Sequence, residues 1–243
     1  MSPTIAGKTV LVTGANRGLG RALVDEALRR GATRVYAASR QPVVVPDERV
    51  TPLIMDVTDR AQIHEALDQV ESLDVLINNA GVSVPDDLSD RIAFEEHLAV
   101  NLYGTLDVTE AFLPSLVRSH GAVVNVVSLS AVAAVPVMPA YSVSKAALMS
   151  ATQSLRALLA ARGVSVHAVL PGPIDTDMVR ALDIPKTSPA DVARGTLDGV
   201  ERGDEEIFPD PMAQSLADGW RTGVAKEFER QNAAMVQAEP AAA

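Results

Sequence analysis

The side chains best suited to chemistry in this sequence are Tyr141 and Lys145, in the run Tyr-Ser-Val-Ser-Lys. At this spacing two side chains of a helix lie on one face, within a few ångströms of each other. A free phenol has a pKa of about 10, which is too high for easy proton exchange near neutral pH. A neighbouring ammonium favours the phenolate and lowers this pKa. The pair is therefore a candidate general acid and base, although surface helices also carry this spacing by chance.

Ser128 lies where a hydroxyl could serve such a reaction. It follows residues 122–127, an apolar run that predicts a buried strand. In an open parallel sheet the carboxyl ends of the strands form the edge at which ligands bind. A hydroxyl at this place can bond a substrate oxygen while Tyr141 exchanges its proton. Ser130 is an alternative for this role, and a simple cap of the strand end is an alternative function for Ser128.

A glycine-rich turn near the amino end has the context of a nucleotide site. Residues 9–13 form a short apolar run typical of a buried strand, and Gly14, Gly18 and Gly20 follow in the pattern T-G-x-x-x-G-x-G. The next segment carries its apolar residues on one helical face. Glycine lets the backbone approach a pyrophosphate closely, and free N–H groups at a helix start attract an anion. The turn predicts a dinucleotide site, and a glycine turn without a ligand is the alternative.

The composition excludes several classes of protein. The chain has 243 residues, a formal net charge of −10 and no cysteine. The negative charge argues against nucleic acid or an anionic membrane as a partner, and the lack of cysteine excludes disulfides and thiolate chemistry. The amino terminus lacks the apolar core of a signal peptide, and no apolar run is long enough to cross a membrane. We therefore expect a cytoplasmic protein that binds neither nucleic acid nor membrane.

Strand-like and helix-like runs alternate along the chain. After the glycine turn, strands are expected at residues 34–38, 50–55, 74–77, 122–127 and 164–170, and helices at residues 60–70, 92–117, 141–162 and 189–202. This alternation predicts right-handed βαβ units and one doubly wound parallel sheet with helices on both faces, a three-layer α/β/α architecture. We expect a single domain over residues 1–236 and a disordered tail over residues 237–243.

Two segments interrupt the alternation. Residues 172–188 combine prolines with several apolar side chains, a composition typical of a long, partly helical lid over a site. Residues 206–209 fit a short edge strand that a proline ends. The histidines are scattered, so no metal site is predicted, and we expect surface or packing roles for His64, His97, His120 and His167.

Taken together, these residues resemble the classical short-chain dehydrogenase/reductase family over nearly the whole chain. The matching positions stand in the family's order and spacing: Thr13 to Gly20, Asn78 to Gly81, Asn101, Ser128, Tyr141, Lys145, Pro171 and Gly172. The resemblance implies a Rossmann-like fold and hydride transfer between a nicotinamide cofactor and a carbonyl carbon.

The resemblance also implies roles for single residues. Tyr141 would be the acid and base, and Lys145 would bind the nicotinamide ribose and lower the pKa of the tyrosine. Ser128, in preference to Ser130, would orient the reacting oxygen, and Asn101 would hold a helix distortion and a water of the proton relay. The cofactor-binding residues would be Gly14, Asn16, Arg17, Gly18, Leu19, Gly20, Ser39, Arg40, Asp56, Val57, Asn79, Ala80, Gly81, Tyr141, Lys145, Pro171, Gly172, Ile174 and Thr176.

The end of the second predicted strand indicates which dinucleotide binds. NAD-selective sites place an acidic residue there to bond the ribose hydroxyls, and its charge repels a 2′-phosphate. This chain has Ser39 and Arg40 instead. Arg40 can form paired hydrogen bonds with phosphate oxygens, and Arg17 approaches from the glycine turn. We therefore expect NADP(H) to be preferred over NAD(H).

The side chains expected around a substrate are almost all aliphatic: Val82, Ala131, Val132, Val135, Val137, Met138, Ile174, Met178, Val179 and Leu182. No cation is clearly aimed at the substrate, although Arg180 and Lys186 lie in the lid, and a buried anion without a partner is costly. The expected substrate is a neutral, fairly hydrophobic ketone or aldehyde and its alcohol. The alternative is a non-catalytic dinucleotide-sensing or scaffold protein of the same fold, which would have no reason to keep the four dispersed polar residues of the catalytic set.

Two predicted helices are more apolar than one covered face requires. The helix that contains residues 146–159 is small or apolar around most of its circumference, and the helix that contains residues 102–112 is similar. Members of the resembling family pair these two helices across a two-fold axis. We therefore expect a homotetramer, or a homodimer.

Overall fold

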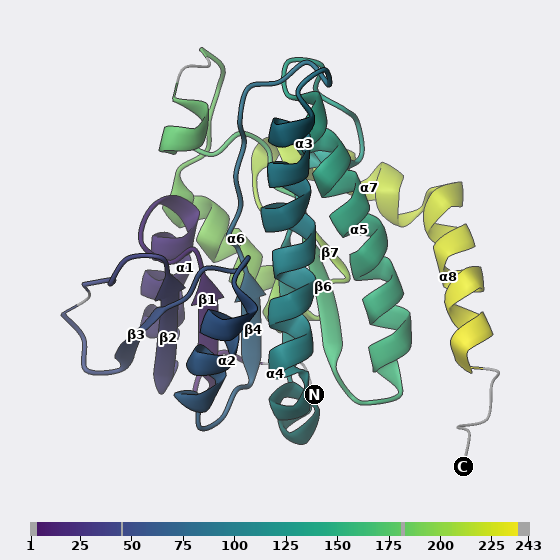
Figure 1. Cartoon of the computed structure of the whole chain (residues 1–243). Coiled ribbons are helices and arrows are strands. Elements are labelled where there is room, and N and C mark those ends of the chain that lie inside the picture. Colours follow the sequence, from purple (N-terminus) through teal and green to yellow (C-terminus); the bar gives the residue numbers. More distant parts are fainter. Residues whose placement is uncertain (1–3, 45, 181–182, 238–243) are drawn as a thin grey trace.

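The computed structural model describes residues 4–44, 46–180 and 183–237 and contains one seven-stranded parallel sheet (Figure 1). The strands are β1 (Thr9–Thr13), β2 (Arg34–Ser39), β3 (Val50–Ile54), β4 (Val75–Asn78), β5 (Ala122–Val126), β6 (Ser165–Val169) and β7 (Glu206–Ile207). Their order in the sheet is β3-β2-β1-β4-β5-β6-β7. The doubly wound parallel sheet is confirmed, and the short edge strand expected at residues 206–209 is β7.

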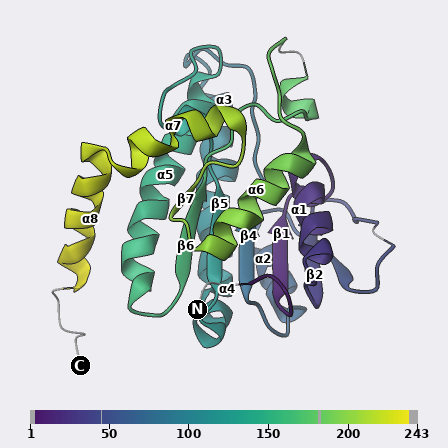
Figure 2. The ribbon, with the colours of Figure 1, turned by 180° about the vertical axis from the view of Figure 1, so that it is seen from behind.

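Helices cover both faces of the sheet, as Figures 1 and 2 show. One face carries α1 (Gly18–Arg29) and α6 (Pro189–Arg202), and the other carries α2 (Arg60–Asp68), α4 (Thr105–Ser119) and α5 (Pro139–Ala160). The strands are buried between these layers, so alternate side chains of β1 enter two different cores, Val10 and Val12 on the α1 side and Leu11 on the other. The three-layer α/β/α architecture is therefore confirmed.

The helix expected over residues 92–117 is one helical run with a distortion in its middle. It consists of α3 (Arg91–Leu98), a π-helical segment (Ala99–Gly104) and α4. A π-helical turn contains one extra residue, which re-aims the side chains around it and is frequent at functional sites. Asn101 lies in this segment.

Two helices at the carboxyl end, α7 (Pro211–Arg221) and α8 (Val224–Gln237), were not expected from the sequence. The start of α7 has ordinary capping chemistry, because the side chain of Asp210 accepts a hydrogen bond from Ala213 N and Pro211 is the first helical residue. α8 includes Gln237, so the first residue of the expected tail is helical, and residues 238–243 lie outside the described residues.

α8 is attached to the rest of the chain by charged side chains. Lys226, which is 2% exposed, places Nζ 2.9 Å from Glu206 Oε1 and 3.0 Å from Glu229 Oε2. Arg156 of α5 pairs with both of these glutamates. The apolar side chains of α8 lie on the opposite side of the helix, where Val224, Phe228 and Met235 are 88%, 61% and 68% exposed. In α8, therefore, the charged face of the helix packs against the rest of the chain and the apolar face is exposed to solvent.

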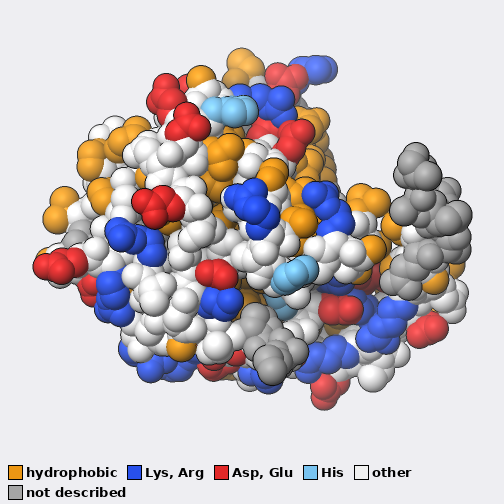
Figure 3. All heavy atoms as spheres, turned by 90° about the horizontal axis from the view of Figure 1, so that it is seen from below, with side chains coloured by type: hydrophobic (Ala, Val, Ile, Leu, Met, Phe, Trp, Pro, Cys, Tyr) orange, Lys and Arg blue, Asp and Glu red, His pale blue; other side chains and the backbone are white. Residues whose placement is uncertain are grey.

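No helix in the part of the chain that the structure describes is long and apolar enough to span a bilayer. On the face at the amino ends of the strands, acidic and basic side chains are interspersed (Figure 3). The carboxyl ends of the strands lie at the other end of the molecule, together with α7 and the segment that follows β6 (Figure 2).

Candidate active site

The glycine turn brings the start of α1 close to the end of β4. Gly14 has a φ of +65°, and a Cβ on it would lie 2.9 Å from Ala80 Cα, so only glycine fits this approach. Arg17, which precedes α1, makes no side-chain capping bond, and the first turn of α1 has no acidic residue. Gly18, Leu19 and Gly20 line a cavity. The turn thus presents uncapped helical N–H groups to the cavity, which suits a pyrophosphate.

Side-chain hydrogen bonds hold the ends of β1 and β4 together at the point where the strand order reverses. Thr13 Oγ1 accepts hydrogen bonds from the backbone N–H groups of Asn79 and Ala80, each at 3.0 Å. Asn79 Nδ2 donates to Thr13 O at 2.9 Å. Ligands of open α/β sheets bind at such a reversal point.

The residues expected around the adenosine end line the same cavity. Ser39 is buried and donates its hydroxyl to Gln41 O, whereas Arg40 is exposed at the cavity. Asp56 Oδ1 accepts hydrogen bonds from the backbone N–H and the hydroxyl of Thr58, at 2.9 and 2.7 Å. Val57 and Asn16 also line the cavity.

Tyr141 and Ser128 come together from α5 and the end of β5. The Ser128 side chain lies beside the phenol, and both residues line the cavity. Burial raises the pKa of Tyr141 to about 12, because the desolvated phenolate loses more than the neighbouring Ser128 hydroxyl restores. The lowered pKa expected from the sequence is therefore wrong for this state of the site.

Lys145 explains this difference. Its Nζ lies 5.7 Å from the centre of the Tyr141 ring, and its hydrogen bond among the described residues goes to Val126 O at 2.8 Å and not to the phenol oxygen. The side chain is 4% exposed, and desolvation lowers its pKa to about 8. The spacing of four residues placed the two side chains on one helix face as expected, but the direction of the ammonium was not predictable from spacing.

Ser130, the alternative to Ser128, is placed differently. Its backbone N–H donates to Ser128 Oγ at 3.1 Å, and its own hydroxyl oxygen is buried without a hydrogen-bond partner. Ser128 is the serine that contacts Tyr141. The geometry therefore favours Ser128 as the residue that meets a substrate oxygen.

Asn101 is the one residue of the expected set that does not line the cavity. It is 1% exposed, and its Nδ2 donates to Val82 O at 3.0 Å and to Ser144 Oγ at 2.9 Å. Its Oδ1 accepts from Val82 N at 2.9 Å. The π-helical segment thus ties the turn after β4 to α5, so Asn101 acts on the cavity through the position of this turn.

Three positioning residues had no clear sequence signal. Asp86 Oδ1 accepts from Ala140 N at 3.0 Å and so caps the start of α5 from a distant loop. His97 Nε2 accepts from Val84 N at 3.0 Å, and its ring meets the Tyr141 ring edge-on at 6.4 Å. Asp210 Oδ2 accepts from Gly172 N at 2.8 Å. The packing role expected for His97 agrees with these contacts.

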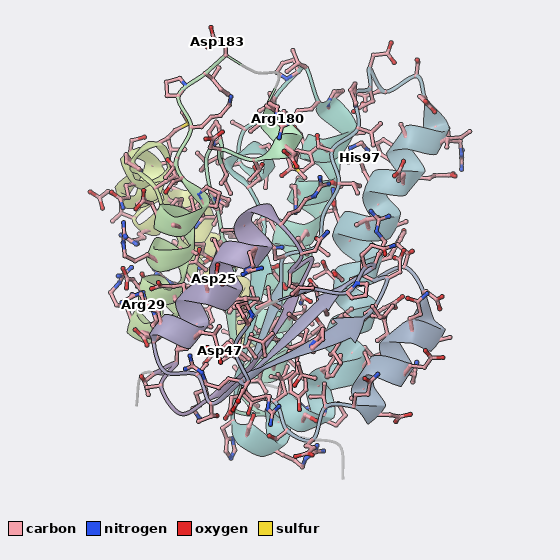
Figure 4. All side chains as sticks on the ribbon, turned by 90° about the vertical axis from the view of Figure 1, so that its left-hand side faces the viewer. Asp25, Arg29, Asp47, His97, Arg180 and Asp183 are labelled. Atoms are coloured by element: carbon pink, nitrogen blue, oxygen red, sulfur yellow. The ribbon has the colours of Figure 1, made fainter. Side chains whose placement is uncertain are left out.

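The segment after β6 closes one side of the cavity. Backbone bonds from Asp175 N to Thr187 O and from Thr187 N to Pro173 O, both 2.9 Å, join its two ends. Figure 4 shows Asp183 at its tip and Arg180 below it. Arg17 of the glycine turn pairs with Asp177 of this segment at 3.0 Å. The lid expected over residues 172–188 therefore contacts the nucleotide turn.

The glycine turn, Ser128, Tyr141 and Lys145 face one cavity of about 860 Å³. It is lined by every expected cofactor-binding residue, so the fold brings these residues to one place. Of the expected substrate walls, those that line it are Val82, Val135, Met138, Ile174, Met178 and Val179. Ala131 packs in a core, Val132 and Val137 are exposed, and Leu182 lies outside the described residues. Met212 and Leu216 of α7 line the cavity and were not expected.

The glycine approach, the uncapped start of α1 and the matching cavity fit a nicotinamide dinucleotide. Comparison with known proteins agrees with this. Residues 8–186 match the short chain dehydrogenase family. A dehydrogenase/reductase SDR family protein 7-like of Anopheles gambiae is 30% identical over 245 residues, which cover 87% of this chain and 77% of that protein.

Two further similarities extend this result. The 3-oxoacyl-[acyl-carrier-protein] reductase FabG of Thermotoga maritima is 34% identical over 194 residues, which cover 73% of this chain and 78% of that protein. The crystal structure of a short chain dehydrogenase from Burkholderia cenocepacia J2315 in complex with NADP superposes with a TM-score of 0.86 and 37% identity, covering 94% of this chain and 98% of that one. The chain therefore belongs to the short-chain dehydrogenases, a family of oxidoreductases.

Proposed function

We propose that the protein is an NADP(H)-dependent carbonyl reductase or alcohol dehydrogenase. Its substrate would be a neutral, fairly hydrophobic ketone or aldehyde, or the corresponding alcohol. One observation carries the proposal: the uncapped start of α1 and the Tyr141–Ser128 pair open into the same cavity. Such an arrangement holds a dinucleotide and a reacting oxygen in register.

The side chains have distinct tasks in this proposal. A bound nicotinamide dinucleotide supplies or accepts the hydride. Tyr141 is protonated at neutral pH, because its pKa is raised to about 12, and it can therefore donate a proton to a carbonyl oxygen. Ser128 holds that oxygen through its hydroxyl. Lys145 uses one N–H on Val126 O, which leaves its other donors for ribose hydroxyls and its charge to stabilise a phenolate.

Arginines at the adenosine end support the preference for NADP(H). Arg40 and Arg17 both line the cavity, and Ser39 stands where an acidic residue would repel a 2′-phosphate. The Burkholderia cenocepacia relative, 37% identical, is a complex with NADP.

The charged residues of the cavity wall support a neutral substrate. Outside the expected cofactor-binding set, the charged residues that line the cavity in the described part of the chain are Glu96 and Asp177, and Asp177 is paired with Arg17. Arg180 and Lys186 are not among its lining residues, so an anionic substrate would meet little compensating charge. Relatives named 3-oxoacyl-[acyl-carrier-protein] reductase make neutral 3-oxoacyl thioesters part of the same test.

The experiment measures the turnover of a panel of substrates from the change in NADPH absorbance. It would contain alkyl and aryl ketones, a 3-oxoacyl thioester and small charged keto acids. Turnover of neutral ketones or of the thioester is the expected result. Activity confined to charged keto acids would show that the substrate class is wrong, and NADPH binding without any turnover would favour a sensor or scaffold.

The proposal includes a cytoplasmic homodimer or homotetramer. Part of the apolar circumference of α5 is covered within the chain, by α3, by the π-helical segment and by α8. Val143 and Leu158 of α5 and Tyr103 of the π-helical segment remain exposed, at 42%, 55% and 56%. These side chains support pairing of this face with a second copy.

A further inference from the structure

We infer that the protein takes substrates with an extended apolar chain, which lies between α7 and the segment after β6 and is selected by Met212 and Leu216. This rests on the proposed carbonyl reduction and adds to it a direction for the substrate and two specificity-determining residues. The observation behind it is that α7 supplies part of the cavity wall although no sequence pattern marked it for this role.

α7 is fixed to the cavity by a buried carboxylate. Asp210 is 2% exposed, and it accepts one hydrogen bond from Gly172 N and one from Ala213 N in the first turn of α7, at 2.8 and 3.0 Å. Charge-assisted bonds of this kind are short and directional. The start of α7 is therefore held against the turn that follows β6, and its side chains keep a defined place beside the cavity.

The two residues that follow this anchor form an apolar wall. A Cβ on Gly172 would lie 3.3 Å from both Cβ and Sδ of Met212, so the methionine packs directly on the Pro171–Gly172 turn. Leu216 follows one helical turn later on the same face, and both residues line the cavity. They are 45% and 44% exposed, so about half of each side chain still faces solvent at the mouth.

The opposite wall has the same character. Met178 and Ile184, from the segment after β6, also line the cavity and are 47% and 42% exposed. Figure 2 shows this segment and α7 at the same end of the sheet. Single exposed apolar side chains are scattered over most protein surfaces. A group of them around one opening indicates a binding surface.

The occupant of this mouth follows from its position. Tyr141 and Ser128 fix the reacting oxygen deep in the cavity, and the apolar walls lie at the opening. A small ketone contacts only the residues near Tyr141 and Ser128. A linear alkyl chain of several methylenes extends from there to the opening and covers Met212 and Leu216. Full burial of one methylene stabilises the bound state by about 0.8 kcal/mol, a factor of about four in kcat/KM. Because these walls are half exposed, we expect a gain in kcat/KM of about twofold per methylene.

The test compares 2-butanone with 2-nonanone for the wild type and for Met212→Gln and Leu216→Asn, with NADPH consumption as the readout. The wild type should favour 2-nonanone in kcat/KM by at least about tenfold, following the gain of about twofold per methylene. Each variant should lose most of this gain, measured as the ratio of kcat/KM for 2-nonanone to kcat/KM for 2-butanone. Met235→Gln is the matched control, because Met235 lies on α8 away from the cavity and is 68% exposed, and it should behave as the wild type.

A second measurement is independent of turnover. The chain has one tryptophan, Trp220, one helical turn after Leu216 on α7. Titration with a non-reactive long-chain amide, nonanamide, should change the Trp220 emission saturably, more weakly for butanamide, and less in both variants. Equal response to both chain lengths, or variants that lower activity on 2-butanone and 2-nonanone alike, would overturn the inference. If nonanamide binds as expected while no ketone is reduced, the proposed activity is wrong and the apolar mouth stands.

Discussion

Arg40→Ala should remove most of the preference for NADPH over NADH. Arg40 lies exposed at the cavity, directly after Ser39 at the end of β2. In the described part of the chain no salt bridge engages it, so its guanidinium is available to a 2′-phosphate without breaking an existing pair. NADH has no such phosphate, and its kcat/KM should stay within about twofold of wild type.

The magnitude follows from the environment of the two arginines. A hydrogen bond to a charged group is worth about 1.5–3 kcal/mol, and screening at an exposed site keeps the effect of Arg40 near the lower end, about 10- to 50-fold in kcat/KM for NADPH. Arg17 already pairs with Asp177 at 3.0 Å, with the two side chains 70% and 44% exposed. Such a pair is worth about 0–1 kcal/mol, so Arg17→Ala should cost less than Arg40→Ala, about three- to tenfold. Asp177→Asn frees Arg17 and should raise the NADPH preference by up to about fivefold.

The assay measures kcat/KM for each cofactor at a saturating ketone and at two ionic strengths. The effect of Arg40→Ala on NADPH should shrink at high salt, because the charges are exposed. Arg34→Ala is the control, since Arg34 starts the same strand at the other end of the sheet and bonds Thr51. An equal loss for NADH and NADPH in Arg40→Ala, or a wild type that prefers NADH, would refute the reasoning.

Three other outcomes test the site and one tests the assembly. Tyr141→Phe should lower kcat by about 10²- to 10⁴-fold with NADPH binding retained by fluorescence titration, because the ring keeps its packing and only the proton donor is lost; substantial residual kcat would contradict the assignment. In wild type, kcat/KM for NADPH should fall as pH rises through about 8, where Lys145 loses its charge, and Lys145→Arg should remove this limb; a flat wild-type profile would contradict it. Asp210→Ala should lower Tm by about 4–16 °C in calorimetry, since it removes a helix cap and leaves Gly172 N–H buried, a loss of about 2–4 kcal/mol. Light scattering at micromolar concentration should give a dimer or tetramer, and a monomeric mass would refute the pairing of α4 and α5.

Much of the fold and of the cofactor site was predictable because the signals are local. The apolar runs of the strands and the glycine spacing are set by stereochemistry within a few residues, and they placed β1, Gly14 and the start of α1 correctly. The polar residues at strand ends followed from parallel pairing, which brings those ends to one edge.

What the sequence did not reveal depends on contacts between distant segments. Asp86 caps α5 across 54 positions of sequence, and Asp210 reaches Gly172 across 38. Acidic residues in loops are too common to signal such partners. The pKa of Tyr141 depends on how deeply the phenol is buried and on whether Lys145 bonds the phenol or the Val126 carbonyl. The spacing of four residues between Tyr141 and Lys145 predicts neither.

α8 was missed for a different reason. Its buried side carries Lys226 and Glu229, and its apolar side chains face solvent, so the usual link between apolar periodicity and burial is reversed. Its partner Glu206, on the edge strand, is also 2% exposed in its side chain.

This reversed attachment limits how the sequence can drift. If Lys226 changes alone to an apolar residue, Glu206 and Glu229 stay buried and share Arg156 as their remaining cation among the described residues, and breaking a buried pair costs up to about 3–5 kcal/mol. That is a large part of the 5–15 kcal/mol by which a domain of ordinary stability is folded. Replacement of the whole charged set by apolar residues is by contrast often neutral or stabilising. Homologous sequences should therefore carry the α8 attachment either as the complete charged set or as a complete apolar set. Sequences in which only one charged residue of the set is replaced should be rare.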